Sequence, residues 1–238
     1  MNIGNSLSAL SKFEWGLWTI SVVVVTSSFL LGGEFYILTL ITSLIGVTAL
    51  IFVAKGDVLG QVLTIIFSLG YSVISWRFHY YGEIITYLGM TAPIAGLSVV
   101  SWLKHPYEKE KNVVEVAQLT ITQKIKMVAL AIVVTAIFYF ILKYFNTTNL
   151  TISTISVTTS FLASYLMFCR SSAYALAYAM NDIVLIVLWI LATLESISFL
   201  PMIICFTMFF CNDMYGFVNW QRMSKKQSKE KELQKNID

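Results

Sequence analysis

The sequence predicts an all-α polytopic membrane protein with about eight transmembrane helices. Hydrophobic residues make up 57% of its 238 positions, the mean hydropathy is +0.75, and only 12% of residues are charged. Apolar stretches of about 17–25 residues follow one another with short connections. Lys and Arg gather in alternate connections, a bias that fixes orientation in membranes. Apart from the 104–124 loop and a charged tail, we expect no room for a soluble catalytic domain.

Eight stretches are expected to form spanning helices: residues 15–31, 35–54, 58–76, 83–103, 125–145, 149–168, 173–194 and 197–219. The first lacks a clear cleavage site, so we expect a retained helix within an N-terminal segment, 1–34, instead of a signal peptide. Pro93 is expected to kink the fourth helix. The charged segment 223–238 is expected to be a solvated, frayed tail, with binding to anionic lipid as the alternative.

The distribution of basic residues predicts the orientation. With eight spans and both termini on one side, that side holds all of the 16 Lys and Arg residues except Arg77 and Lys143. Positive charge marks the cytoplasmic side of a membrane. We therefore expect both termini to be cytoplasmic, in a multi-pass protein of the cytoplasmic membrane.

Two groups of three helices resemble each other, which predicts an internal repeat. The matched positions, at shifts of 115 and 118 residues, are Thr39 and Thr154, Ser43 and Thr158, Lys55 and Arg170, and Trp102-x-Lys104 and Trp220-x-Arg222. One helix separates the groups, so both run in the same direction, as in a parallel repeat. The predicted domains are a three-helix bundle (35–104), a cytoplasmic loop with a linker helix (105–148) and a second three-helix bundle (149–222).

One face of the seventh helix is the strongest candidate for a binding site. Tyr174, Tyr178, Asn181, Asp182 and Trp189 fall within about 100° of helical arc. A carboxylate and an amide are costly in lipid, so they should face a cavity or a partner. Aromatic rings around a buried carboxylate suit a small, flat cation. Alternatively, Asp182 is structural and either bonds to a hydroxyl of the sixth helix or stays protonated.

Other polar side chains extend this candidate site. Gln61 and Ser68 lie on one face of the third helix, and Asn212 and Tyr215 share a face of the eighth. Packing between helices is the alternative explanation, above all for Ser and Thr. The full predicted substrate site comprises Asn181, Asp182, Trp189, Tyr178, Tyr174, Gln61, Ser68, Phe67, Asn212, Tyr215 and Trp102.

The residue inventory favours a transporter over an enzyme. The predicted spans contain no His and no carboxylates paired at catalytic spacing in the sequence. The three cysteines form no CxxC pattern and are expected to be core residues. We expect no cofactor, no metal site and no nucleic-acid partner. Because no acidic pair or unwound cation site is evident, passive transport is expected.

Residues 35–223 resemble the PnuC family of bacterial vitamin-precursor transporters. The resemblance rests on two motifs. One is Asn181-Asp182 followed by Ile183 to Trp189, and the other is Asn212-Asp213-x-Tyr215-Gly216-x-x-x-Trp220. Weaker pieces are Tyr80-Tyr81-Gly82-Glu83 and Ser101-Trp102. The resemblance implies a fold like that of SWEET sugar transporters, with a homotrimeric assembly. It also implies facilitated uptake of nicotinamide riboside, trapping by a cytoplasmic kinase, and a central site lined by Asn181 and its neighbours.

The chain departs from the family pattern at several of these positions. Tyr174 and Tyr178 stand where Trp is expected beside the central amide, and Phe67 and Ser68 stand where the third helix should carry an amide. These departures leave thiamine or another nucleoside-like vitamin, carried with or without an ion, as the alternative substrate.

Overall fold

The computed structural model describes residues 3–31, 37–77, 81–107 and 110–235. The elements in chain order are α1 (Ile3–Ser8), α2 (Lys12–Leu31), α3 (Ile37–Lys55), α4 (Val58–Arg77), α5 (Tyr81–Thr86), η1 (Tyr87–Thr91), α6 (Ala92–Lys104), β1 (Pro106–Tyr107), β2 (Glu110–Val114), α7 (Ile121–Tyr144), α8 (Leu150–Phe168), α9 (Tyr174–Glu195), η2 (Ile197–Phe199) and α10 (Leu200–Lys235). Within these residues, eight helices are long and apolar enough to cross a membrane, when α5, η1 and α6 count as one. The predicted class is confirmed.

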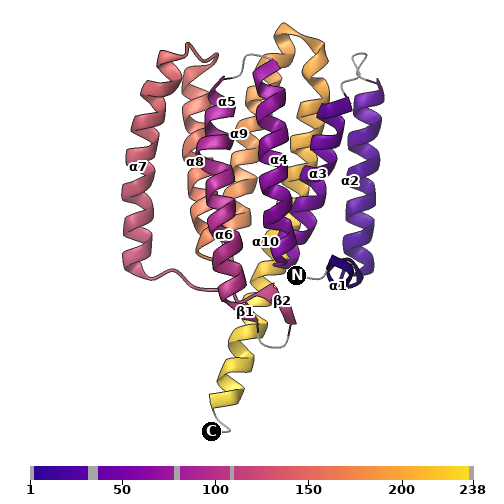
Figure 1. Cartoon of the computed structure of the whole chain (residues 1–238), viewed down its shortest axis with the longest axis vertical. Coiled ribbons are helices and arrows are strands. Elements are labelled where there is room, and N and C mark those ends of the chain that lie inside the picture. Colours follow the sequence, from indigo (N-terminus) through magenta and orange to yellow (C-terminus); the bar gives the residue numbers. More distant parts are fainter. Residues whose placement is uncertain (1–2, 32–36, 78–80, 108–109, 236–238) are drawn as a thin grey trace.

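The helices stand side by side in one upright bundle (Figure 1). We call its lower end, from which the C-terminal half of α10 emerges, the tail end, and its upper end the far end. The first triplet, α3, α4 and α5–α6, and the second triplet, α8, α9 and α10, are joined by contacts of α10 with α3 and of α6 with α8. Each third helix thus packs on the first helix of the other triplet. This exchange is what the predicted repeat leads one to expect, although the repeat itself stays a prediction.

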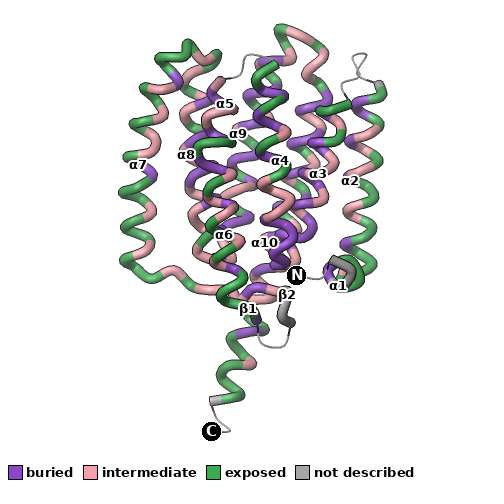
Figure 2. Tube along the Cα trace, in the orientation of Figure 1, coloured by how far each residue is buried: buried purple, intermediate pink, exposed green. Residues whose placement is uncertain are grey.

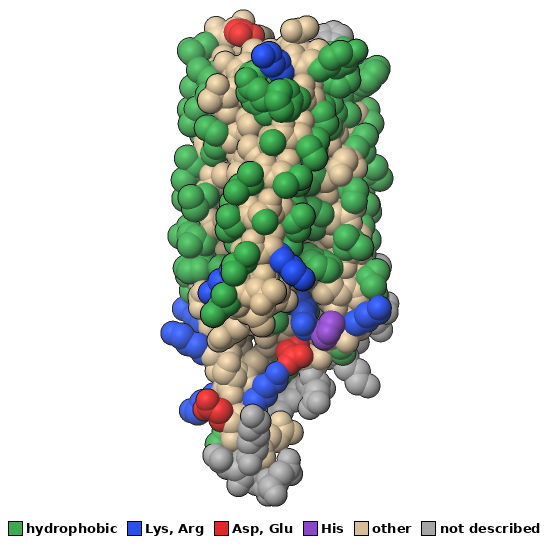
Figure 3. All heavy atoms as spheres, turned by 90° about the vertical axis from the view of Figure 1, so that its left-hand side faces the viewer, with side chains coloured by type: hydrophobic (Ala, Val, Ile, Leu, Met, Phe, Trp, Pro, Cys, Tyr) green, Lys and Arg blue, Asp and Glu red, His purple; other side chains and the backbone are tan. Residues whose placement is uncertain are grey.

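Two of the spanning helices stand outside the two triplets. α2 packs on α3 and α10, whereas α7 packs chiefly on α8 and is exposed along most of its length (Figure 2). The face bearing α7 is a continuous apolar band, and most of its Lys and Arg side chains lie near the tail end (Figure 3). An exposed apolar surface of this height needs a lipid environment or further protein to cover it.

The last helix is longer than the sequence suggested. The expected frayed tail at 223–238 is wrong for its described part, because α10 continues without a break to Lys235. The Gln, Lys and Glu residues of this extension are strong helix formers. The buried Gln227 side chain also ties the extension to the linker, donating to the Val114 carbonyl and accepting from the Val116 amide at 3.2 and 2.8 Å.

The linker between the triplets runs beneath the tail end. The linker includes the unexpected β1–β2 hairpin. The amide of Val114, the last residue of β2, donates to the Gly56 carbonyl, and the Ala117 amide donates to the Arg170 carbonyl, both at 2.9 Å. Gly56 and Arg170 end α3 and α8 with positive φ values of 76° and 58°. The left-handed turn at Gly56 is open to glycine without strain. The linker therefore contacts the corresponding turn of each triplet.

The fourth span is not a regular helix. Its central turn, η1, is π-helical, and Pro93 follows in the first turn of α6. Proline cannot donate the bond that would close on the carbonyl four residues earlier, and its ring crowds that carbonyl. A widened turn relieves the clash. The predicted distortion is present, and it turns Tyr87 and Thr91 toward the centre of the bundle.

Candidate functional site: a central cavity between the triplets

A cavity of about 610 Å³ lies between the two triplets. Residues from α3, α4, η1, α8, α9 and α10 line it, and none comes from α2 or α7: Gly46, Ala49, Leu50, Val53, Thr64, Phe67, Tyr87, Thr91, Ser160, Met167, Tyr178, Asn181, Asp182, Leu185, Phe206, Phe209 and Asp213. It combines apolar walls with a few polar groups, as small-molecule sites do.

Hydrogen bonds to α8 fix two polar side chains of α9. The Asn181 side-chain oxygen lies 2.7 Å from the Thr159 hydroxyl and 3.0 Å from the Ser160 hydroxyl. The Tyr178 hydroxyl lies 2.9 Å from the Ser164 hydroxyl. Side chains held in this way lose little further freedom when a ligand binds. The hydroxyl-rich sixth span therefore supports the cavity wall from behind.

Two carboxyl groups approach each other in the wall of the cavity. Asp182 of α9 and Asp213 of α10 are both buried, both line the cavity, and are close enough to interact electrostatically. Two neighbouring carboxylates repel each other, so a shared proton or a bound cation stabilises the pair. The sequence-based expectation that the membrane holds no acidic pair is therefore wrong. The pair belongs to helices whose mutual rotation the sequence does not reveal.

An aromatic layer closes the cavity toward the far end. We define this far-end layer by rings from four elements, α4, η1, α9 and α10, each 4.4–6.5 Å from a neighbour: Phe67, Tyr71, Tyr87, Trp189, Phe206 and Phe209. Trp189 stacks on Phe206 at an interplanar angle of 17°. Gly46 admits this packing, because a Cβ there would lie 2.4 Å from the Phe209 ring.

A second layer closes the cavity toward the tail end by reciprocal bonds. The Trp102 indole donates to the Met167 carbonyl at 3.3 Å, and the Trp220 indole donates to the Val53 carbonyl at 2.9 Å. Each Trp thus reaches from the third helix of one triplet to the first helix of the other. Tyr174 fills the same layer, with its ring 4.6 Å from that of Trp220.

Four predicted site residues line the cavity: Phe67, Tyr178, Asn181 and Asp182. Tyr174, Trp102 and Trp189 lie in the two closing layers. Ser68 bonds to the Thr64 carbonyl within its own helix, and Gln61 is buried outside the lining. Asn212 donates to the Ser21 hydroxyl of α2, and the Tyr215 hydroxyl donates to Glu14 of the same helix.

Sequence reasoning missed Tyr87, Phe206, Phe209 and Asp213. On α10, Phe206, Phe209 and Asp213 follow the i, i+3, i+7 spacing of one helix face. The polar residues that drew attention, Asn212 and Tyr215, lie on the adjoining face, toward α2. Reading the helix from Asp213 instead of Asn212 would have found the two phenylalanines.

Comparisons with known proteins agree with this architecture. A family model described as nicotinamide mononucleotide transporter matches residues 36–222. The chain is 26% identical over 192 residues to the nicotinamide riboside transporter PnuC of Neisseria mucosa, covering 79% of this chain and 73% of that protein. It superposes with a TM-score of 0.80 on a crystal structure described as the vitamin B3 transporter PnuC. That match, at 24% identity, covers 92% of this chain and 94% of the other and shows a shared fold.

Proposed function

The chain belongs to the nicotinamide mononucleotide transporter family, as the predicted PnuC resemblance indicated, and from that premise we propose that it carries nicotinamide riboside across the membrane. The observation that carries the proposal is the central cavity, in which an acidic pair and aromatic rings stand beside a fixed amide. Nicotinamide riboside has a flat pyridinium cation, a carboxamide and ribose hydroxyls. Rings and carboxylates suit the cation, while Asn181, Ser160 and Thr91 suit the other groups.

The charge of the cavity favours the riboside over its phosphorylated form. The lining includes two carboxyl groups and no Lys, Arg or His among the described residues. A phosphomonoester is usually bound by Arg, Lys or a cluster of backbone amides. Its two negative charges would instead meet Asp182 and Asp213 here. We therefore infer that the transported species is the nucleoside.

The charge contact can be tested with matched ligands. Asp182→Asn should weaken the binding of nicotinamide riboside by on the order of 1.5–3 kcal/mol, the contribution of a hydrogen bond to a charged group. The uncharged C-nucleoside analogue, which has the same shape, should lose much less. Isothermal titration of the purified protein measures both affinities. Equal losses for the two ligands would show that Asp182 is structural. Thiamine in the same titration tests the alternative substrate.

We infer facilitated diffusion as the mode of transport, with trapping by a cytoplasmic kinase. The acidic pair makes proton coupling the specific alternative, because a bound cation can replace the shared proton. In liposomes that contain the purified protein, labelled riboside should equilibrate and stop. Enclosed riboside kinase and ATP should then produce accumulation without any gradient. Accumulation that appears only with an imposed proton or sodium gradient would replace this mechanism by a coupled one.

We further propose that the tail end is cytoplasmic and that the protein is a homotrimer in the cytoplasmic membrane. The described basic residues support the orientation, since Arg77 and Lys143 alone lie at the far end. The exposed apolar length of α7 supports an assembly. An impermeant thiol reagent on intact cells should label Thr148→Cys and not Lys231→Cys, and the reverse pattern would overturn the orientation. Light scattering of the purified protein tests the trimer.

A further inference from the structure

A second, smaller cavity opens at the far end between the two triplets, with about 420 Å³ of empty space when the part open to solvent is included. Its walls come from the start of α5, the loop before α8 and the last turns of α9. Trp189 lines this cavity and stacks on Phe206, which lines the central cavity. The far-end layer thus separates the two cavities.

Glu83 is the unusual feature of this far-end cavity. Its side chain lines the cavity and is only 5% exposed, and its Oε2 atom has no hydrogen-bond partner. A second unpartnered oxygen, Oγ1 of Thr147, belongs to the loop before α8, which forms another wall of the cavity. None of the residues lining the cavity is Lys, Arg or His. Burying a carboxylate without a partner is costly, and the cost is recovered when a cation occupies the adjacent space.

We propose that the far-end cavity is a second binding site, for flat organic cations of the pyridinium class, in which Glu83 holds the ligand before it passes the far-end layer. The proposal rests on the proposed function for its choice of ligand. Trp189 offers an aromatic face to the cation, and Asn149 and Ser153 offer polar groups for its substituents. Glu195, which is exposed at the α9 wall of the cavity, adds to the negative potential there.

This site gives the transporter a charge filter ahead of its central cavity. A cation gains the contact with Glu83, a neutral analogue gains only the ring contact, and a phosphorylated nucleoside is repelled. Glu83 also lies within electrostatic range of Tyr71 and Tyr87, two rings of the far-end layer. A cation bound at Glu83 is therefore in place to enter as those rings separate.

The test uses the full-length protein in lipid nanodiscs with 1-methylnicotinamide, a pyridinium cation without ribose, and with neutral nicotinamide. Wild type should bind two equivalents of the cation. Glu83→Gln should weaken binding at the far-end cavity by about tenfold, and Asp182→Asn should weaken binding at the central cavity by a similar factor. Glu232→Gln, a carboxylate in an exposed position at the tail end of α10, should change affinity less than twofold because it lies outside both cavities and is screened by solvent and salt. Binding of nicotinamide should not change in Glu83→Gln.

The outcomes separate this proposal from the proposed function. One equivalent in wild type, lost only in Asp182→Asn, would overturn the far-end site and leave the central site intact. Binding lost in Glu83→Gln but unaffected by Asp182→Asn would support the far-end site and contradict the central one. The melting temperature of Glu83→Gln should not fall, because the neutral amide removes an unpaired buried charge. A marked fall would reveal a structural partner of Glu83 and overturn the proposal.

Discussion

The two ends of the bundle close the central cavity by different chemistry. At the tail end, two indole groups donate to backbone carbonyls of the opposite triplet, Trp102 to Met167 and Trp220 to Val53. Next to them, the Asn219 amide donates to the Ala54 carbonyl at 2.9 Å. At the far end, the closure is a layer of rings in which Trp189 packs on Phe206. The tail end is held by directional bonds, and the far end by stacking.

This difference predicts unequal costs of opening. Each hydrogen bond contributes about 0.5–1.5 kcal/mol, and a buried group left unpaired costs about 1–3 kcal/mol. An aromatic pair adds about 0.5–1.5 kcal/mol beyond its buried area, and separated rings leave no polar group unpaired. The linker strengthens the tail end further. We therefore expect the ligand-free protein to sample states open at the far end more often than states open at the tail end.

The largest expected effect is that of Trp189→Ala, which removes the ring that covers Phe206. Truncating a buried Trp costs about 3–5 kcal/mol. Most of this loss should destabilise the conformation in which the far end is closed. A cysteine reporter at Ala192, in a background without native cysteines, should react with thiol reagents at least about a hundredfold faster. A reporter at Ala54 should stay unreactive. Riboside transport should slow.

Trp76→Ala is the matched control for this change, since Trp76 is 65% exposed on α4. It should leave both reporters unchanged. A similar increase at Ala54 and Ala192 in Trp189→Ala would mean that the whole bundle had loosened. The far-end layer would then not be a separate closure.

The next effect concerns the tail end. Trp102→Phe combined with Trp220→Phe keeps two aromatic rings but removes both indole donors. The Val53 and Met167 carbonyls keep their bonds from the Gly56 and Arg170 amides, so the cost is that of two lost hydrogen bonds, about 1–3 kcal/mol. The Ala54 reporter should therefore react on the order of thirtyfold faster. Each single variant should give about half of this effect on a logarithmic scale. Strong asymmetry between the single variants would contradict the reciprocal closure.

Local composition accounts for the parts of the fold that the sequence predicted well. The spanning helices were predictable because each must be apolar over the membrane thickness whatever its neighbours are. The distorted fourth span was predictable from Pro93, whose effect is also local. The helical tail was not, because its stability depends partly on Gln227 bonding to a linker more than a hundred residues earlier. The hairpin in that linker likewise gave no clear local signal.

The candidate site was only partly predictable, because helix rotation is a tertiary property. The inward face of α9 was read correctly as one face, yet Tyr174 and Trp189 are about 22 Å apart along it at 1.5 Å per residue. They therefore belong to opposite closing layers instead of one wall. On α10, two adjacent faces are polar, and packing against α2 takes Asn212 and Tyr215. Only the packed bundle shows that Asp213 meets Asp182.

A smaller effect is expected where α10 holds the linker. Gln227→Ala removes both bonds from the buried side chain to Val114 and Val116. Losing these bonds should cost about 1–2 kcal/mol and speed reaction of the Ala54 reporter by about tenfold. Limited proteolysis should cleave the linker sooner. Gln234→Ala, an exposed position on the same helix, is the control and should change neither measurement. An unaltered reporter in Gln227→Ala would show that the linker does not support the tail-end closure.

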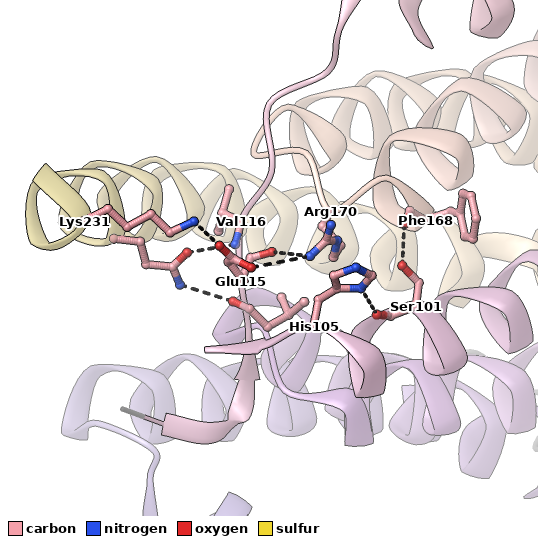
Figure 4. Close-up of polar contacts among 9 residues, drawn as sticks. Ser101, His105, Glu115, Val116, Phe168, Arg170 and Lys231 are labelled. Atoms are coloured by element: carbon pink, nitrogen blue, oxygen red, sulfur yellow. Dashed lines mark hydrogen bonds and ion pairs between the residues drawn. The ribbon is translucent and has the colours of Figure 1, made fainter. Parts of the chain in front are cut away.

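The smallest effect, and the one that separates ion pairs from hydrogen bonds, is expected at Glu115. Its side chain bonds to Lys231, and Arg170 donates to its backbone carbonyl at 3.3 Å (Figure 4). These groups are partly exposed, and ion pairs of this kind contribute about 0.2–1 kcal/mol. Glu115→Gln should therefore speed reaction of the Ala54 reporter only about two- to fivefold. At about 1 M salt, where the screening length falls to about 3 Å, this difference should vanish. The effect of the Trp102 and Trp220 changes should persist, because those donors are neutral.

Burial lowers the pKa of the Arg170 guanidinium, yet that group stays charged at accessible pH, so salt and not pH is the variable to scan. An effect of Glu115→Gln that equals that of the paired Trp changes and resists salt would assign the tail-end closure to the linker instead of the reciprocal bonds.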